Sequence, residues 1–589
     1  MIPKLKIDHS SSAPVFSQNA LNILRERYLR RDEAGSLVES PAEMLERVAE
    51  TIAAAGRIFG DDVSYWEERF LERLTRLEFL PNSPTLMNAG LPGGQLAACF
   101  VLPLEDSLDS IFATLGQAAR IHQSGGGTGF SFSALRPAKD QVRSTGGVAS
   151  GPLSFMDLFD HTTAVIRQGG RRRGANMAVL RVDHPDIEAF VEAKLRPGRL
   201  ENFNLSVGLT ENFLAAVDGG TAFGLCNPRS GRITRAVDAV NLFERIVKAA
   251  WERGDPGLLF LDEINRHNPT PALGAIEATN PCGEQPLLPY ESCTLGSINL
   301  AALSDGDGFD WRRFRSVIRD AVVFLDNVID ANCYPSPEIE AATRKTRKIG
   351  LGIMGLAELL AKSGAPYDSE QALQFGERIA SFLQIEARAA SGELARKRGS
   401  FPAFHDSGWP KRMLSGLRNA TVTCIAPTGT ISLIAGTSSG IEPFFSLALV
   451  RRVLDGRILK EINPLIVEAL APFGKTGEMA LQAIRERGSV REVSDLPEAL
   501  RGRFPIAFDI SPEFHVRMQA VFQAHVDAAV SKTVNLPQSA PPEAVRRVFQ
   551  LARRLRLKGI TVYRYGSRPG QTLSLMEEGA GPDCRECAA

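Results

Sequence analysis

The 589-residue chain lacks any apolar run approaching the roughly 18–20 residues that a transmembrane helix needs. Residues 1–8 also lack the apolar core of a signal peptide. No charge sign is in excess, because lysine plus arginine and aspartate plus glutamate are equal at 68 each. The balance gives no reason to propose nucleic-acid or membrane binding, so we expect neither partner.

Cysteine is sparse, with eight residues and no regular framework. Such usage fits a reducing compartment, so we expect a cytoplasmic protein. We find no internal repeat and no internal low-complexity segment. The composition, 44% hydrophobic and 23% charged, is that of an ordinary globular protein.

The residue pattern predicts three parts. Residues 1–80 form a helical N-terminal region, with apolar residues at helical spacing in 21–31, 42–59 and 65–79. In residues 81–570 short apolar strands alternate with helices, which predicts an α/β fold with much parallel sheet. The predicted strands are 97–102, 178–182, 257–261 and 421–425, and the predicted helices are 111–123, 311–333 and 370–398, the last with Asp368 or Ser369 as N-cap. Residues 571–589 are expected to form a mobile tail.

The most informative segment is 280–285, in which Asn280, Cys282 and Glu284 alternate with Pro281 and Gly283. Proline and glycine disfavour a helix, and on an extended turn residues i and i+2 point the same way. One loop is therefore able to present an amide, a thiol and a carboxylic acid to one polar substrate. Cys293 follows eleven residues after Cys282. The alternative is a surface turn with a buried cysteine.

Two further segments suit a ligand. Residues 426–432 lie between a predicted strand and a predicted helix, and their hydroxyls and free backbone N–H groups suit phosphate binding. The alternative is a helix cap. Residues 124–130 contain four glycines, which permit close backbone approach to a ligand or merely a flexible connection.

Arginines and glycines are mixed in residues 167–176, a composition that suits contacts with phosphate or a nucleobase. The alternative is a solvated run of charge. Asp106 and Ser107 are, on their own, a helix cap.

Cys584 and Cys587 form one CxxC pair close to the last residue. A structural zinc site usually needs four ligands, and no second pair lies nearby, so we expect no metal site. A thiol shuttle is one interpretation, and the remnant of a zinc ribbon is the other.

Taken together, these segments resemble the catalytic chain of ribonucleotide reductases. The matching pieces run in family order over residues 80–570, and they are 82–85, Cys99, 280–284, Cys293 and 427–431. Within the family the chain looks most like the dimeric, adenosylcobalamin-dependent branch, which residues 17–21, 27–29 and 558–564 resemble.

Two alternatives remain beside this branch. An oxygen-dependent large chain, which needs a separate radical-generating subunit, carries adjacent tyrosines near its C-terminus, where this sequence has Val562-Tyr563. The N-terminus also lacks anything resembling that branch's ATP-binding domain. The Asp-x-His-x-x-Gly cobalamin motif is missing too, which is neutral because the branch binds cobalamin without it. The second alternative is a catalytically silent nucleotide-binding regulator.

The resemblance implies a ten-stranded α/β barrel made of two five-stranded parallel half-sheets, with Cys282 at the tip of a central finger loop. A radical derived from adenosylcobalamin would take hydrogen from Cys282, which would then take the ribose 3′ hydrogen. Glu284 would act as general base, and Asn280 would hold the ribose hydroxyls. Cys99 and Cys293 would deliver two electrons and close as a disulfide.

The resemblance also implies binding residues and partners. The substrate, with a diphosphate favoured over a triphosphate, would contact Ser83, Ala98, Gly127, Pro427, Thr428, Gly429, Thr430 and Ile431. A deoxynucleotide effector at a homodimer interface would contact Asp106, Ser107, Arg136, Arg167, Gln168 and Arg172. A thioredoxin-like protein would act through Cys584 and Cys587. The remaining cysteines, interpreted as structural, are Cys226, Cys333 and Cys424.

Overall fold

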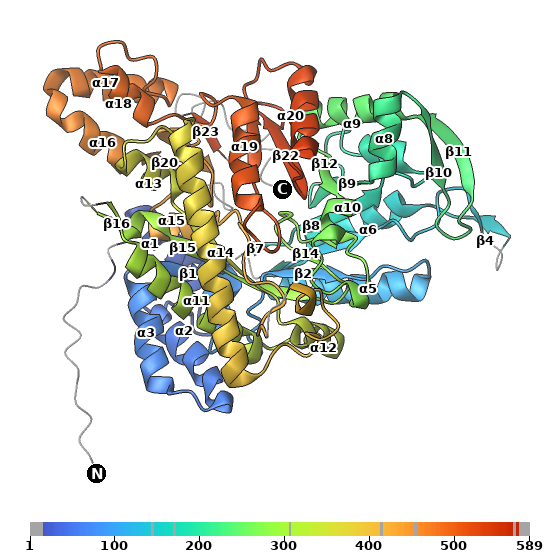
Figure 1. Ribbon diagram of the computed structural model, residues 1–589, viewed down its shortest axis with the longest axis horizontal. Helices are drawn as coiled ribbons and strands as arrows, with labels where there is room; N and C mark the ends of the chain where they lie inside the picture. The colour runs from blue at the N-terminus through green and yellow to red at the C-terminus, as the bar shows by residue number, and fades with distance from the viewer. Residues whose placement is uncertain are drawn as a thin grey trace.

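The computed structural model describes residues 14, 16–142, 146–168, 172–305, 308–412, 416–452, 458–568 and 573–575. The N-terminal region is helical (blue in Figure 1) and comprises α1 (Gln18–Ile23), α2 (Pro41–Ala55) and α3 (Val63–Thr75). Two of the predicted helices end in a non-α turn. A π-helical turn follows α1, and a 3-10 turn, Gly56–Phe59, follows α2. Ser40 and Glu43 form a capping box that fixes the start of α2.

Five parallel strands form one half of the central sheet. In order across the sheet they are β2 (Cys99–Leu102), β3 (Gly127–Ser131), β8 (Asn176–Arg181), β9 (Phe203–Leu209) and β12 (Gly257–Phe260). Their residues are almost all buried, as expected for a parallel sheet that is covered on both faces. The helices that connect them are α5 (Leu108–Gln123), α6 (Pro152–Val165), α7 (Ile187–Val191), α8 (Glu211–Gly219) and α9 (Ala239–Arg253).

The second half is also parallel, and it runs opposite to the first. It contains β15 (Ser292–Asn299), β18 (Ile349–Met354), the segment 421–425, β21 (Thr533–Leu536) and β22 (Gly559–Arg564). Residues 421–425, predicted as a strand, pair only through the isolated parallel bridges Leu351↔Thr423 and Ile425↔Val530. The halves meet antiparallel at both junctions, β2 with β15 and β12 with β22. The predicted ten-stranded barrel of two parallel half-sheets is therefore confirmed.

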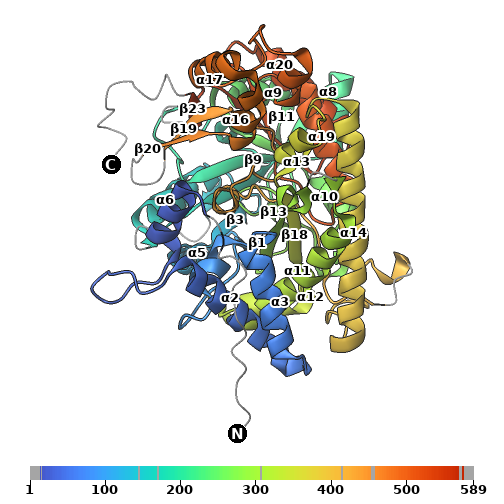
Figure 2. The same cartoon turned by 90° about the vertical axis from the view of Figure 1, so that its left-hand side faces the viewer.

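Helices of 7 to 29 residues cover the second half (Figures 1 and 2). They are α11 (Trp311–Ala331), α12 (Pro337–Thr346), α13 (Leu356–Lys362), α14 (Glu370–Arg398), α19 (Pro512–Gln523) and α20 (Pro542–Arg554). The α14 helix has the predicted bounds, and Ser369 caps it by accepting the Ala372 N–H at 3.1 Å. The α11 helix packs against α2 and α14, and so joins the N-terminal helices to the barrel.

Smaller elements surround the barrel. The shorter helices are α4 (Ser83–Asn88), α10 (Leu261–Arg266), α15 (Ile431–Ala435), α16 (Pro464–Leu470), α17 (Gly474–Arg487) and α18 (Glu498–Arg503). Outer strand pairs are β4 (Gln141–Val142) with β5 (Gly147–Val148), β6 (Arg167–Gln168) with β7 (Arg172–Arg173), β10 (Ala222–Cys226) with β11 (Ile233–Asp238), and β16 (Ser304–Asp305) with β17 (Gly308–Phe309). The strand β1 (Phe79–Pro81) pairs antiparallel with β15.

The predicted tail contributes one described strand, β23 (Leu573–Leu575), which pairs with β19 (Ala448–Arg452), and β19 in turn pairs with β20 (Ile458–Ile462). The division of the chain at residues 80 and 570 stays a prediction. Within the described residues, the helices are too short or too polar to cross a membrane.

Candidate active site

A hairpin inside the barrel carries the segment that the sequence singles out. Its strands are β13 (Ala278–Thr279) and β14 (Pro286–Leu287). Between them Asn280 N–H donates to Gln285 O at 3.1 Å, and Gln285 N–H donates to Asn280 Oδ1 at 2.9 Å. Gly283 has φ +82°, a conformation that glycine adopts without strain. We call residues 280–285 the finger loop.

The barrel wall is shaped to receive the finger loop. A side-chain carbon at Gly129 in β3 would collide with the Thr279 carbonyl oxygen, and one at Gly127 would lie 2.9 Å from Pro281 Cγ. Asn204 in β9 donates its side-chain amide to Pro281 O at 2.8 Å. Glycines on one strand and an amide on another thus fix the hairpin in the middle of the barrel.

Two of the predicted thiols face each other beneath the finger loop. Cys293 in β15 is the direct partner of Cys99 in the antiparallel pairing with β2. Asn280 donates its side-chain N–H to Cys99 Sγ at 3.1 Å, so the loop contacts this pair. Both cysteines are free and buried, and Glu284 is 2% exposed. Burial, followed by the Glu284 carboxylate and neighbouring thiols, raises the pKa of Cys99, so its thiol stays protonated at neutral pH.

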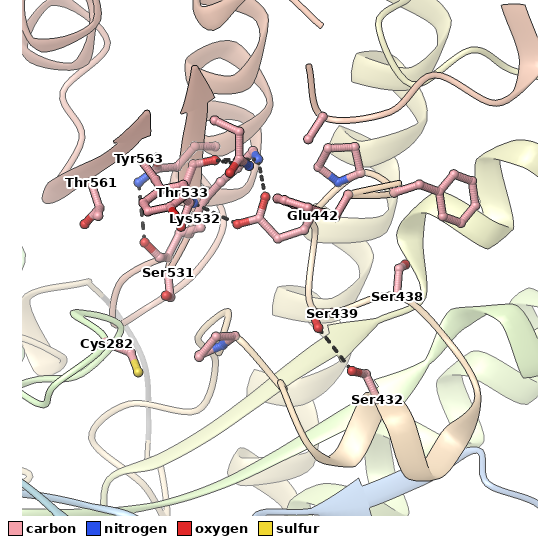
Figure 3. A pocket seen from close by; sticks show the side chains of 18 of the residues that line it. Cys282, Ser432, Ser438, Ser439, Glu442, Ser531, Lys532, Thr533, Thr561 and Tyr563 are labelled. Atoms are coloured by element: carbon pink, nitrogen blue, oxygen red, sulfur yellow. Dashed lines mark hydrogen bonds and ion pairs between the residues drawn. The ribbon is translucent and has the colours of Figure 1, made fainter. Parts of the chain in front are cut away.

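Cys282 is exposed to a cavity of about 1090 Å³ at one end of the barrel. Figure 3 shows its sulfur directed toward this space, with a wall of hydroxyl groups and one ion pair opposite. The labelled wall residues are Ser432, Ser438, Ser439, Glu442, Ser531, Lys532, Thr533, Thr561 and Tyr563. Pro281, Gly283 and Pro427 also line the cavity.

The ion pair was not predicted from the sequence. Lys532 Nζ lies 2.6 Å from Glu442 Oε2 and 3.1 Å from Nδ1 of the buried His515. Burial, opposed by Glu442, lowers the pKa of Lys532, and burial and then the Lys532 cation hold the pKa of His515 well below its usual range. Ninety residues separate the charged partners, and neither belongs to a motif, so no local signal predicts the pairing.

The other predicted substrate residues come from three places in the chain. Ala98 O accepts the Gly127 N–H at 2.9 Å, where β2 and β3 begin. Ser83 opens α4, and its hydroxyl is 2.7 Å from that of Tyr28. In the turn before α15, Thr428 has φ +51° and its hydroxyl accepts the Gly440 N–H at 2.8 Å, Gly429 is exposed, and Thr430 and Ile431 follow.

The predicted effector residues lie on the outside of the first half-sheet. Ser107 is the N-cap of α5, and the Arg136 guanidinium lies 2.8 Å from Asp106 Oδ2. Arg167 and Gln168 form β6, which pairs with the strand containing Arg172 and lies near α5. The side chains of these last three residues lie outside the described part of the structure.

Cys584 and Cys587 also lie outside the described residues. The other unassigned cysteines, Cys226, Cys333 and Cys424, are free. Over the described ranges, histidine, cysteine, aspartate and glutamate form no group of three or more that could hold a metal ion.

Two family models match nearly the whole chain. The model described as "Ribonucleotide reductase, all-alpha domain" covers residues 15–94, and "Ribonucleotide reductase, barrel domain" covers residues 97–563. Among solved structures, the "class Id ribonucleotide reductase alpha subunit" of Actinobacillus ureae superposes with a TM-score of 0.77 over 94% of this chain and 99% of that chain. It is 24% identical in sequence, so this likeness concerns the fold alone.

Sequence relatives carry the comparison further. A protein of Mycobacterium tuberculosis named "Vitamin B12-dependent ribonucleoside-diphosphate reductase" is 55% identical over 94% of this chain and 80% of its own length. One of the same name from Thermoplasma acidophilum is 45% identical, with the same two coverages. The barrel, the hairpin inside it and these matches together place the chain in the ribonucleotide reductase family.

Proposed function

We propose that this protein reduces ribonucleoside diphosphates to 2′-deoxyribonucleoside diphosphates through a radical on Cys282, with adenosylcobalamin as cofactor. The observation that carries the proposal is the finger loop, which brings Cys282 to the large cavity while Asn280 contacts the Cys99–Cys293 pair. The names of relatives that are 45–55% identical support the diphosphate substrate and the cofactor.

The cavity fits a bulky cofactor. Its volume of about 1090 Å³ reaches the upper end of the roughly 300–1,000 Å³ typical of ligand pockets, which leaves room for more than a nucleotide. Its hydroxyl-rich wall suits a group held by its polar periphery rather than by metal coordination. The hydroxyl and ammonium side chains that would contact it are Ser438, Ser439, Ser531, Lys532 and Thr561. When bound, adenosylcobalamin supplies an organic radical.

Each functional residue of the finger loop has a separate role in the proposed reaction. Cys282 loses a hydrogen atom, takes one from the ribose 3′ carbon and returns it at the end of the cycle. Glu284, two residues away, removes the proton of the 3′ hydroxyl. The Asn280 amide is fixed by Gln285 and Cys99, and it orients the ribose hydroxyls. Cys99 and Cys293 supply two electrons and two protons and become a disulfide, while the 2′ hydroxyl leaves as water.

The substrate is proposed to lie between the finger loop and the turn at residues 427–431. Pro427 lines the cavity, and the exposed Gly429 leaves room for phosphate oxygens beside the backbone. Ser83, Ala98 and Gly127 are proposed to hold the ribose end, because the last two lie against the Pro281 side of the finger loop.

We further propose a homodimer that binds a deoxynucleotide effector. Leu108 and Phe112, four residues apart on α5, are 62% and 54% exposed, and Val165 at the end of α6 is 69% exposed. Apolar side chains on two packed helices suit a contact with a second copy. Asp106, Ser107 and Arg136 adjoin this surface. We also propose that the effector acts through residues 167, 168 and 172 and that the reductant is a thioredoxin-like protein. The proposed location is the cytoplasm, where thiols stay reduced.

The test is an assay of the purified single chain with adenosylcobalamin, a small dithiol and each ribonucleotide as diphosphate or triphosphate. We expect deoxyribonucleotide from the diphosphates without any second protein. Activity that appears only after a radical-generating subunit is added would favour the oxygen-dependent alternative. Nucleotide binding without product under both conditions would favour the silent regulator.

A further inference from the structure

A buried lysine lies beside one of the two facing thiols. Cys293 pairs with Cys99 on one side of β15, and on the other side β15 runs parallel to β18 with Thr294 opposite Ile349. Lys348 directly precedes Ile349, so the same register places Lys348 alongside Cys293. The order across three neighbouring chain segments is Cys99, Cys293, Lys348.

An ion pair with Glu291 holds the Lys348 ammonium group close to Cys293. Its side chain is 1% exposed, and Nζ lies 2.6 Å from Glu291 Oε2. Glu291 precedes Cys293 by two residues, so the ion pair and the thiol share one face of the chain. The Glu291 carboxylate also accepts the Leu288 N–H at 2.7 Å and the Thr346 hydroxyl at 2.7 Å. Three donors therefore stabilise the negative charge of Glu291.

The two thiols consequently face different charges. The titratable groups that act most strongly on Cys99 are Glu284 and the thiols of Cys293, Cys282 and Cys424, and all four disfavour a thiolate. Cys293 faces Cys424, Glu284 and Glu291, which also disfavour a thiolate. The Lys348 cation also acts on Cys293, against the rise that burial and Cys424 impose on the pKa of this thiol.

The sulfurs also differ in position. Cys99 Sγ accepts the Asn280 N–H at 3.1 Å, on the side of the finger loop. Cys293 is 0% exposed against 4% for Cys99, and its thiol is directed to the carbonyl of Thr294 at 3.5 Å. A reductant that enters along the finger loop therefore meets Cys99 first.

We propose that the Cys99–Cys293 disulfide is opened by attack on Cys99 Sγ, and that Lys348 stabilises Cys293 Sγ as the leaving thiolate. The inference rests on the proposed function, because it requires that disulfide to form. Lys348 is a positioning residue here, since it acts through Cys293 and does not contact the substrate.

The step balances with a dithiol as reductant. Its first thiolate bonds to Cys99 Sγ while the bond between the two protein sulfurs breaks and its electron pair passes to Cys293 Sγ. The second thiolate of the reductant then attacks the first sulfur and releases Cys99. The reductant becomes a disulfide, and Cys99 and Cys293 each take up one proton.

The direct test traps the first intermediate. The full-length protein is oxidised by one turnover without reductant, and mass spectrometry establishes that the Cys99–Cys293 disulfide is present. It is then treated with 2-mercaptoethanol and iodoacetamide together, so that the sulfur released is alkylated at once. We expect mercaptoethanol on Cys99 and the alkyl group on Cys293. The reverse pattern, or equal amounts of both, would overturn the inference.

Variants test the part played by Lys348. Lys348→Met alone leaves Glu291 buried and unpaired, so the informative protein is Lys348→Met/Glu291→Gln, which removes both charges. We expect its disulfide to be reduced by dithiothreitol severalfold more slowly. Lys348 acts on Cys293 more strongly than Glu291 does, so the loss of both charges raises the pKa of the leaving thiol, which then departs more slowly. Lys348→Arg keeps the cation and restores the rate. Lys345→Met, at an exposed lysine three residues earlier, serves as the matched control.

Thermal unfolding of each variant separates a loss of fold from a loss of rate. An unchanged reduction rate in the folded double variant would remove Lys348 from the step. Failure of the disulfide to form at all would instead contradict the proposed function. The two failures are thus distinguished within one experiment.

Discussion

Cys99 and Cys293 lie directly opposite each other, as partners across the antiparallel junction of β2 and β15, although 194 positions separate them in the sequence. Opposed residues of an antiparallel pair have Cα atoms roughly 4.5–5.5 Å apart. This separation lies within the range of about 4.4–6.8 Å found in disulfides. The junction between the half-sheets is therefore a place where a disulfide can form with little movement of the backbone.

The first prediction concerns this pair. One turnover without reductant will leave Cys99 and Cys293 joined, so that differential alkylation and mass spectrometry find both protected until a dithiol is added. Cys99→Ser and Cys293→Ser will each prevent the protection, whereas Cys226→Ser, in the outer strand β10, will not. Two free thiols after turnover would contradict the electron-donor role.

The second prediction concerns the contact between β3 and the hairpin that carries the finger loop. Gly129→Ala places a methyl group where the Thr279 carbonyl lies, so the hairpin must shift. We expect a loss of roughly 1–3 kcal/mol of stability and a marked fall in kcat. Gly502→Ala is the control, because nothing lies within 4 Å of its added carbon in α18. Equal activity of the two variants would show that β3 does not position the loop.

The third prediction concerns pH. Lys558 is buried and donates to the carbonyls of Asp527, at 2.9 Å, and Ala528. Burial, opposed by Asp527, lowers its pKa to about 8 from 10.5. Between these values the unfolded chain binds more protons, so the contribution of Lys558 to stability rises with pH and is lost as pH falls through about 8. The full change is roughly 3 kcal/mol.

Lys558→Met lacks this titration. The denaturant midpoint of each protein is measured at pH 7.5 and at pH 9.5. From the lower to the higher pH, the midpoint of the native chain should rise more than that of the variant. Parallel behaviour of the two proteins would mean that Lys558 titrates alike in the folded and unfolded chains.

Much of this arrangement was predictable from local sequence. The helix at Glu370–Arg398 follows from its apolar spacing and the Ser369 cap, and the β2 strand follows from a short apolar run. Residues 421–425 show the limit of such reasoning. The run predicts a strand, and its backbone bonds to β18 (Leu351 N–H to Val422 O, 2.8 Å) and to Ala529 (Ile425 N–H to Ala529 O, 3.1 Å). The run itself does not show which segments flank it, because pairing depends on neighbours that are distant in the sequence.

The same limit applies to the site. The alternation of Asn280, Cys282 and Glu284 is visible in the sequence, because all three lie within five consecutive residues. The Lys348–Glu291 and Lys532–Glu442 pairs are not visible, since each joins segments that only the barrel brings together. Cys424 matches no motif, yet it lies in one buried cluster with Cys99 and Cys293.

The fourth prediction concerns Cys584 and Cys587. The Cys99–Cys293 pair is buried, and a large protein reductant cannot reach it directly. Removal of residues 580–589 should abolish turnover driven by a thioredoxin-like protein and spare turnover driven by a small dithiol. Cys584→Ser/Cys587→Ser should behave as the truncation does, and Cys333→Ser, at an exposed cysteine of the described part of the chain, as the full chain does. Full activity of the truncated chain with the protein reductant would mean that the pair has no shuttle role.

The most direct test of the account is product formation by Cys282→Ser. An O–H bond is too strong to exchange hydrogen usefully with an organic radical, so we predict no deoxyribonucleotide from this variant under conditions in which the native chain turns over. Nucleotide binding, followed by equilibrium dialysis, should be unchanged, because Cys282 is exposed to the cavity and serine is close to cysteine in size. Retained deoxyribonucleotide formation by Cys282→Ser would contradict the assignment of the radical to the finger loop.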